Sequence, residues 1–224
     1  AIAELLISKG HTVIGTGRRQ EKLDELQTQL GDKFIPLNFD VSDLPATKTA
    51  LQTLPSHVLN NLDVLVNNAG LALGLEPADK TDFADWQQMV NTNILGLIHL
   101  THEILPLMVA NNDGYIINLS STAGNYPYFG GNVYGATKAF VTQFSLNLRA
   151  DLVGKNIRVS NIEPGLCGGT EFSNIRFHGD DAKAAQVYDS VQYVTPQDIA
   201  NMVAWLIEQP KHVNINRIEV MPTA

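Results

Sequence analysis

Cysteine is almost absent from this chain of 224 residues, which contains only Cys167. A single cysteine cannot form an internal disulfide, which is typical of a reducing compartment and favours a cytoplasmic setting. Cys167 follows E-P-G-L in a glycine-rich loop, and we interpret it as a small loop residue because no base that could activate its thiol lies nearby in the sequence. The six histidines are scattered, without a C-x-x-C or H-x-x-x-H pair, so we expect no metal site.

Positive charge is also scarce. The chain has 15 lysines and arginines against 23 aspartates and glutamates, which gives a net charge of -8 and a pI near 5.1. Nucleic acids and anionic membranes bind basic surfaces, so neither is an expected partner. A run of about eighteen apolar residues and a signal-peptide pattern are lacking too. The expected partners are therefore small molecules and further copies of the chain.

Apolar segments alternate with segments of helical periodicity along the chain. The predicted strands are residues 11–16, 33–39, 63–66, 115–119 and 157–162, with an edge strand at 216–221. The predicted helices are residues 1–9, 20–30, 45–54 after an N-cap at Ser42, 82–106, 132–151 and 195–208. With 44% hydrophobic and 17% charged residues, this alternation predicts an α/β fold, a Rossmann-like doubly wound parallel sheet with helices on both faces, in a single domain over residues 1–224.

Tyr134 and Lys138 stand four residues apart within the predicted helix 132–151, so they share one helix face. A phenol titrates near pH 10 in water, so its use in proton transfer at pH 7 requires about 4 kcal/mol from the surroundings. A neighbouring ammonium acts in the right direction, because it favours tyrosinate and lowers the tyrosine pKa. Ser121, at the end of a predicted strand, can donate a hydrogen bond to a substrate oxygen.

Three further features accompany this pair: Ser121 thirteen residues upstream of Tyr134, N-N-A-G at 67–70 and E-P-G at 163–165. Together these residues resemble the short-chain dehydrogenase/reductase family, and the resemblance covers the whole chain. The segments G-G-N-V-Y-G-A-T-K-A-F and I-E-P-G-L-C-G-G-T-E-F look most similar to its NADP-dependent 3-hydroxy acid (serine) dehydrogenase branch.

The resemblance implies a role for each of four residues. Tyr134 would be the general acid/base, Lys138 would lower its pKa and bind the cofactor ribose, and Ser121 would polarise the substrate oxygen. Asn93, in N-x-x-G at 93–96, is similar to the family asparagine whose backbone holds a water linked to the lysine. From its spacing alone, Asn93 is also compatible with an ordinary core asparagine bound by backbone groups.

The amino-terminal end departs from the family pattern. Residues 1–9 are predicted to be a helix that ends at Gly10, whereas the family has a strand and a glycine-rich turn before this helix. That strand would be central in a sheet ordered 3-2-1-4-5-6. We therefore expect that about fifteen further residues precede Ala1 in the natural protein. The alternative is a natural chain without a pyrophosphate loop, which would be inactive.

Arg18 and Arg19 follow the predicted strand 11–16, where an NAD enzyme of this architecture carries an acid for the ribose 2′-hydroxyl. An arginine there accommodates a 2′-phosphate, so we predict NADP as the cofactor. Two solvated loop arginines are the alternative. Their position just before the helix 20–30 favours an anion nearby, because the helix N-terminus is itself positive.

Two other loops are implied to contact the cofactor. Asp40 and Val41 would hold the adenine, although Asp40 is equally compatible with a plain turn. Asn68, Ala69 and Gly70 would let the cofactor approach the backbone closely, with an asparagine-rich turn as the alternative.

The loop after the predicted strand 157–162 would seat the nicotinamide through Pro164, Gly165 and Thr170. This loop is about two residues longer than the usual family pattern because of Gly168-Gly169, which weakens the assignment of Thr170.

Residues 171–190 are polar and are predicted to form a mobile lid that selects the substrate. Arg176 is the candidate anchor for a substrate carboxylate, because a guanidinium can bind it through two parallel hydrogen bonds. A solvated lid arginine is the alternative, and His178 is a weaker candidate.

These features predict an enzyme that transfers a hydride between NADP(H) and a small 3-hydroxy acid or its semialdehyde. The alternatives are the same chemistry on a sugar, a steroid or an acyl-carrier-linked ketone, and a dinucleotide-sensing protein without turnover. The family resemblance also implies a dimer or tetramer.

Overall fold

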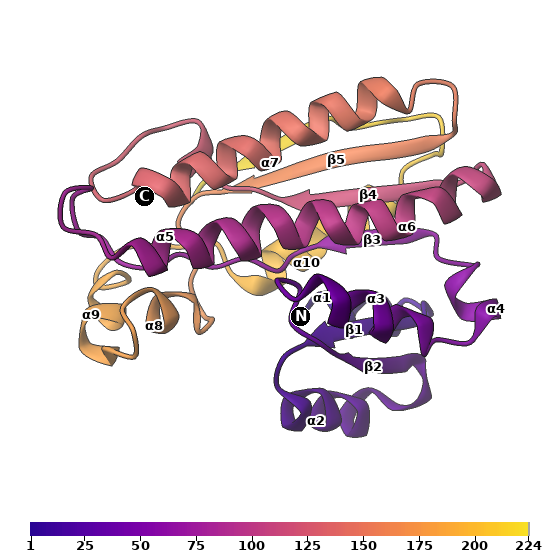
Figure 1. The fold of residues 1–224 in the computed structure, drawn as a ribbon, viewed down its shortest axis with the longest axis horizontal. Helices are drawn as coiled ribbons and strands as arrows, with labels where there is room; N and C mark the ends of the chain where they lie inside the picture. Colours follow the sequence, from indigo (N-terminus) through magenta and orange to yellow (C-terminus); the bar gives the residue numbers. More distant parts are fainter. Residues whose placement is uncertain (224) are drawn as a thin grey trace.

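The computed structural model describes residues 1–223, which form an α/β fold of parallel strands flanked by helices (Figure 1). Strands β1 (Val13–Gly17) and β2 (Phe34–Asn38) form one parallel sheet. Strands β3 (Val64–Asn67), β4 (Gly114–Leu119), β5 (Ile157–Pro164) and β6 (Arg217–Val220) form a second parallel sheet, in that order. The predicted Rossmann-like α/β fold with parallel strands is confirmed, but the strands of the described residues form two separate parallel sheets instead of one continuous sheet.

The helices are α1 (Ile2–Ser8), α2 (Gln20–Leu30), α3 (Leu44–Gln52), α4 (Ser56–Leu59), α5 (Phe83–Val90), α6 (Leu97–Asn111), α7 (Asn132–Asp151), α8 (Phe172–Arg176), α9 (Asp181–Gln186) and α10 (Pro196–Glu208). A π-helical turn, Asn91–Gly96, joins α5 to α6. The predicted bounds of α2 and α7 are confirmed, and α10 begins after Thr195, which forms a capping box with Asp198.

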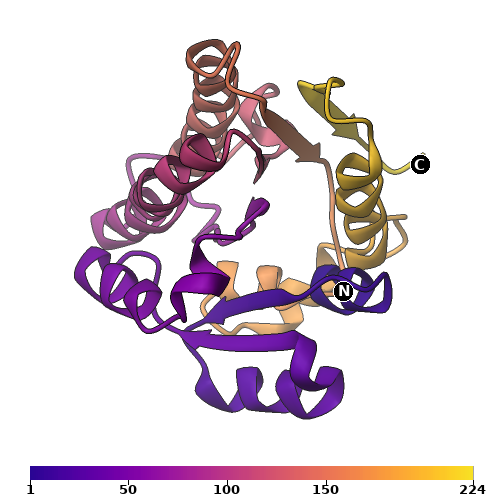
Figure 2. The same cartoon turned by 90° about the vertical axis from the view of Figure 1, so that its right-hand side faces the viewer.

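The larger sheet is covered on both faces (Figure 2). Along β4, Ile116 packs into a core cluster with Ile104, Met108 and Leu148 of α6 and α7. Its neighbour Ile117 points the opposite way, into a cluster with the inward residues of α10. This alternation follows from the two-residue period of a strand, and all of β4 is buried, as expected for a central parallel strand.

Two predictions about element ends were wrong. Asp43, instead of Ser42, caps α3 by accepting a hydrogen bond from the Ala46 amide at 2.9 Å. The helix predicted to end near Pro106 continues to Asn111. Pro106 has no backbone N–H, so the helix loses only the hydrogen bond to the carbonyl of His102, four residues earlier. His102 is exposed, and water can bind its carbonyl instead.

The lid segment was also predicted wrongly in part, because it folds into α8 and α9. Ser173 is buried there, and its hydroxyl lies 2.7 Å from that of Tyr188, which in turn donates a hydrogen bond to the carbonyl of Cys167. The segment is therefore packed against the loop that follows β5.

One helical stretch, Phe83–Asn111, is long and apolar enough to cross a membrane by length and composition. This is weak evidence for a membrane segment, since the core helix of a soluble protein meets the same criteria. In this fold Leu97, Thr101, Ile104 and Met108 of α6 are buried in the protein.

Candidate active site

The carboxyl ends of the strands bring the predicted catalytic residues together. Ser121 follows β4, and Tyr134 and Lys138 lie on α7, which packs against β5 and against the turn after Ser121. Their exposed fractions are 9%, 8% and 6%, so three polar side chains are removed from water at one edge of the sheet. Polar side chains are seldom buried without hydrogen-bond partners, so each partner has to be identified.

Ser121 is held by the chain that follows it. Its hydroxyl donates a hydrogen bond to the Pro164 carbonyl at 3.2 Å and accepts one from the Ala123 amide at 3.1 Å, so it caps the short helix Thr122–Gly124. These contacts fix the side-chain rotamer of Ser121 at the end of β4.

The electrostatic prediction for Tyr134 was wrong in direction. Burial raises the pKa of Tyr134 to about 12, and the nearby Ser121 hydroxyl only partly opposes this effect. Burial likewise lowers the pKa of Lys138 to about 8, and its Nζ donates a hydrogen bond to the Leu119 carbonyl at 2.8 Å. Lys138 Nζ lies 5.8 Å from the centre of the Tyr134 ring, so desolvation outweighs the attraction that the spacing predicts.

Gly70 lies directly against this pair. A Cβ at position 70 would lie 3.3 Å from Lys138 Nζ and 3.4 Å from Asn93 Oδ1. A side chain at position 70 would therefore contact both residues closely, so glycine leaves space beside Lys138. The neighbouring Asn68 and Ala69 are exposed, at the carboxyl end of β3.

The side chain of Asn93 is fully occupied, as in the core-asparagine interpretation. Its Nδ2 donates to the Leu71 carbonyl at 2.8 Å and to Thr137 Oγ1 at 3.0 Å, and its Oδ1 accepts from the Leu71 amide at 2.9 Å. Asn93 also lies in the π-helical turn, a feature that is frequent at functional sites because it displaces backbone groups from the α-helical ladder.

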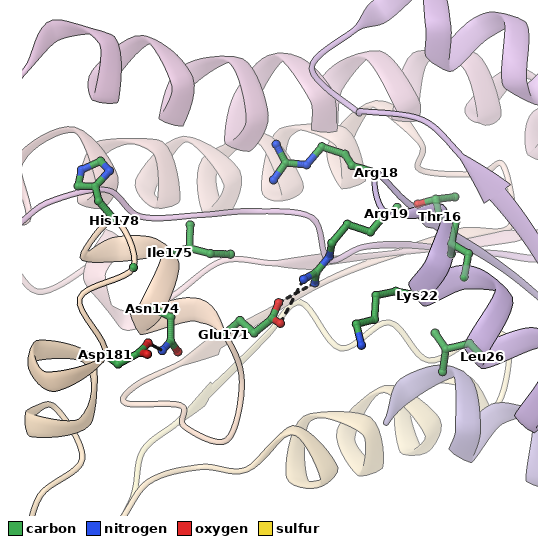
Figure 3. Close-up of a pocket in the computed structure, with 13 residues that line it drawn as sticks. Thr16, Arg18, Arg19, Lys22, Leu26, Glu171, Asn174, Ile175, His178 and Asp181 are labelled. Atoms are coloured by element: carbon green, nitrogen blue, oxygen red, sulfur yellow. Dashed lines mark hydrogen bonds and ion pairs between the residues drawn. The ribbon is translucent and has the colours of Figure 1, made fainter.

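Arg18 and Arg19 lie at the end of β1 and line a cleft of about 1040 Å³ between the start of α2 and the segment with α8 and α9 (Figure 3). Arg19 makes two hydrogen bonds to Glu171, at 3.1 and 2.6 Å. Lys22 lines the same cleft, so three cations gather around the first turn of α2. Sequence reasoning did not find Glu171, because the ion pair joins residues 152 positions apart.

Asp40 closes a turn and also faces Arg18. Its Oδ1 accepts hydrogen bonds from the Ser42 amide and hydroxyl, and its Oδ2 lies 3.4 Å from Arg18 Nη1. Burial alone would raise the pKa of Asp40, but the Ser42 bonds and Arg18 lower it. Val41 packs against Gly96, where a Cβ would lie 2.9 Å from Val41 Cγ2.

The loop after β5 is anchored at its start and exposed at its end. Gly165 donates a hydrogen bond from its amide to the Val220 carbonyl at 2.8 Å, and the Pro164 carbonyl accepts from Ser121. Thr170 is exposed, and its hydroxyl accepts a hydrogen bond from the Phe172 amide at 3.2 Å. Burial raises the pKa of the Cys167 thiol, which agrees with its interpretation as a loop residue.

Arg176 reaches the buried tyrosine from the end of α8. Its Cζ lies 5.7 Å from the centre of the Tyr134 ring, and its Nη2 donates a hydrogen bond to Tyr128 Oη at 2.8 Å. Its Nε binds the Gly74 carbonyl at 3.1 Å. His178 lies further out, exposed, with its Nε2 3.1 Å from Asp85 Oδ2. Arg176 is therefore the lid cation that the structure brings to the site.

Comparison with known proteins agrees with this geometry. A family model described as short chain dehydrogenase matches residues 1–180. A probable NADP-dependent dehydrogenase of Haemophilus influenzae is 67% identical over all of this chain and 88% of its own length. The NADP-dependent 3-hydroxy acid dehydrogenase YdfG of Escherichia coli K12 is 55% identical over 99% of this chain and 89% of its own length. A solved structure of serine dehydrogenase in its closed form with NADP+ superposes with a TM-score of 0.97 at 55% identity, over 99% of this chain and 89% of that one. The chain belongs to the short-chain dehydrogenase family.

Proposed function

We propose that this protein transfers a hydride between NADP(H) and a small 3-hydroxy acid, such as serine or 3-hydroxypropionate, or the corresponding semialdehyde. The observation that carries the proposal is the joint burial of Ser121, Tyr134 and Lys138 at the carboxyl edge of the sheet. The similarity to 3-hydroxy acid and serine dehydrogenases supports both the cofactor and the substrate class. The test is NADPH oxidation with semialdehydes and NADP+ reduction with hydroxy acids.

The residues of the chain divide the proton chemistry between them. Ser121 binds the substrate oxygen through its hydroxyl, and Tyr134 exchanges a proton with that oxygen. At pH 7 a phenol with a pKa of about 12 is protonated, so Tyr134 is ready to donate a proton to a carbonyl. In the opposite direction it must lose its proton first, and the ammonium of Lys138 stabilises the resulting phenolate. A water held by the Asn93 backbone would link Lys138 to solvent and so replace the proton that Tyr134 donates.

The residues present fit an NADP cofactor, which supplies the hydride when bound. Arg18, Arg19 and Lys22 form a cationic cluster suited to a 2′-phosphate. Gly70 leaves space for close approach beside Lys138, whose ammonium would bind the ribose. Asp40 and Val41 would border the adenine.

The loops at positions 68–69 and 164–170 complete the proposed cofactor site. Asn68 and Ala69, both exposed, would contact the cofactor through their backbone. Pro164, Gly165 and Thr170 would border the nicotinamide.

Replacing both Arg18 and Arg19 by alanine is expected to weaken NADPH binding by about 10- to 100-fold, because charge-assisted hydrogen bonds contribute about 1.5–3 kcal/mol. NADH lacks the 2′-phosphate, so its affinity should change less than about threefold. Fluorescence titration of both nucleotides measures the ratio. The charge-matched control is the double variant Lys9→Ala with Lys211→Ala, which removes two cations that are paired with Glu208 and Asp113 outside the cleft. Equal losses for NADPH and NADH would contradict the assignment.

Arg176→Ala is expected to lower kcat/KM for 3-hydroxypropionate by about 10- to 100-fold, mainly through KM, since a guanidinium binds a carboxylate by two hydrogen bonds. 1,3-Propanediol carries a hydroxymethyl group in place of the carboxylate, so kcat/KM for this substrate should fall less than about threefold in the same variant. The control is Tyr128→Phe, which removes the bond to Arg176 Nη2 but keeps the guanidinium. If both substrates lost activity equally, the substrate class in this proposal would be wrong.

A reductase of another carbonyl compound is the second candidate. A sugar, steroid or acyl-carrier ketone does not require a carboxylate anchor, so the same substrate pair separates the two cases. A nucleotide sensor without turnover has no use for the buried serine, tyrosine and lysine. It would be favoured only by NADPH binding without oxidation of the cofactor by any carbonyl compound offered.

We further propose a cytoplasmic homo-oligomer, a dimer or tetramer, that contacts its copies through α6 and the preceding turn together with α7. Leu95 and Phe140 are exposed on these helices, and Phe140 stacks on Phe144. The single cysteine supports a reducing compartment.

A further inference from the structure

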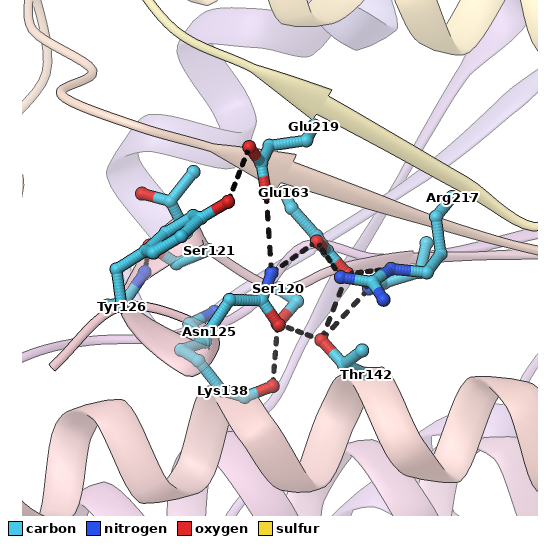
Figure 4. Close-up of polar contacts among 12 residues, drawn as sticks. Ser120, Ser121, Asn125, Tyr126, Lys138, Thr142, Glu163, Arg217 and Glu219 are labelled. Carbon is cyan, nitrogen blue, oxygen red and sulfur yellow. Dashed lines mark hydrogen bonds and ion pairs between the residues drawn. The ribbon is translucent and has the colours of Figure 1, made fainter.

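A carboxylate with no exposed surface lies behind the proposed active site. Glu163, near the end of β5, accepts hydrogen bonds from Asn125 Nδ2 at 2.7 Å, Thr142 Oγ1 at 3.1 Å and Asn161 Nδ2 at 2.5 Å (Figure 4). Arg217 on β6 donates two more, at 2.9 and 2.7 Å. Hydrogen bonds from four different residues therefore converge on one side chain.

Burying this charge costs stability even when it is paired. Apolar side chains of similar volume often replace a buried ion pair without loss of stability, so packing alone does not require an acid at position 163. Glu163 directly precedes Pro164, whose carbonyl accepts the Ser121 hydrogen bond. The carboxylate is thus one residue from a direct contact of the proposed catalytic serine.

The first link leads to Ser121. Asn125, which binds Glu163 Oε2, follows the short helix Thr122–Gly124 that Ser121 caps. The carboxylate consequently fixes the far end of the turn whose near end carries the serine hydroxyl.

The second link leads to Lys138. Thr142, one helical turn after Lys138 on α7, can donate to Glu163 and lies 3.0 Å from the Ser120 hydroxyl. Ser120 in turn donates to the backbone carbonyl of Lys138 at 2.6 Å. Because each hydroxyl carries one proton, Thr142 donates either to Glu163 or to Ser120, and its contacts with both hold the Lys138 backbone next to the carboxylate.

We propose that Glu163 is a positioning residue for hydride transfer: with Arg217 balancing its charge, it fixes Ser121 relative to the helix that carries Tyr134 and Lys138. This inference rests on the proposed function. Misplacement of catalytic groups by about 1 Å can lower turnover by about 100-fold, so the network acts on kcat without contacting substrate or cofactor.

The test compares Thr142→Val with Thr142→Ser, because valine keeps the volume and removes the hydroxyl whereas serine retains it. Thr142→Val should lower kcat by about tenfold or more, with the NADPH dissociation constant within about threefold of wild type, and Thr142→Ser should recover at least about half of the activity. Glu163→Gln should likewise lower kcat and leave the NADPH dissociation constant nearly unchanged.

Ser145→Ala is the matched control for loss of a buried hydroxyl. Ser145 lies on the same helix and accepts a hydrogen bond from Asn118 Nδ2 at 2.8 Å in the sheet, but is not part of the Glu163 network. It should lose stability, measured as Tm, with kcat within about twofold of wild type.

The outcomes separate the two proposals. A wild-type protein without turnover on any hydroxy acid or carbonyl compound would overturn the proposed function and this inference with it. An active wild type whose Thr142→Val variant keeps full kcat, or loses no more than Ser145→Ala, would overturn the inference alone. If Glu163→Gln does not fold, the comparison of Thr142→Val with Thr142→Ser still tests whether the network positions the catalytic residues.

Discussion

Tyr134→Phe is expected to lower kcat by a factor of at least about 100 in both directions, because it removes the only proposed group that exchanges a proton with the substrate oxygen. The phenyl ring keeps the edge-to-face contact with Phe172, whose centre lies 5.9 Å away, so the fold and NADPH affinity should persist. Steady-state kinetics together with NADPH fluorescence titration measures both quantities.

Tyr115→Phe is the matched control for the loss of a buried phenol. The Tyr115 hydroxyl lies 2.7 Å from that of Ser160 in the core, far along β4 from Ser121, so the variant should stay within about twofold of wild-type kcat. If Tyr134→Phe kept more than about a tenth of wild-type activity, the proton would have to travel by another route and the proposed mechanism would be wrong.

Local patterns in the sequence were sufficient for the elements that carry the site. The bounds of α7 were predicted because its apolar residues recur at helical spacing over 20 residues, and that spacing alone brings Tyr134 and Lys138 onto one face. The strand β4 was predicted from its apolar run in the same way, whereas its parallel pairing with β5, which brings Ser121 to the sheet edge, was implied by the family resemblance.

Tertiary contacts decided what sequence patterns could not. The pKa of Tyr134 depends on how completely α7 and α8 exclude water, and spacing carries no information about that exclusion. The Arg19–Glu171 pair joins segments far apart in the chain, so no motif indicates it. Glu163 left no distinct signal, because β5 also contains Arg158, Ser160 and Asn161, and its partner Arg217 is 54 positions away in the chain.

Lys138→Met is expected to lower kcat by at least about 100-fold and, at the same time, to stabilise the cofactor-free protein at pH 7. Burial lowers the pKa of Lys138 from its ordinary value of 10.5 to about 8 in the folded state. This difference corresponds to about 3 kcal/mol of destabilisation from burying the ammonium. Removing the ammonium therefore stabilises the folded state, but the variant also loses the hydrogen bond from Lys138 to the Leu119 carbonyl. That loss offsets about 1 kcal/mol of the gain in stability. The net gain of about 2 kcal/mol should raise Tm by roughly 4–8 °C for a chain of this size.

The pH dependence of that gain distinguishes desolvation of Lys138 from improved packing by methionine. Between pH 8 and 10.5 the unfolded wild-type chain binds more protons than the folded one, so wild-type stability rises with pH in this window relative to the variant. Below pH 8 the lysine is protonated in both states and the full cost is present. Unfolding curves at pH 7, 9 and 10.5 should therefore show the advantage of Lys138→Met shrinking towards zero or reversing. A gain that is independent of pH would mean that packing, and not a buried charge held for catalysis, sets the stability at this site.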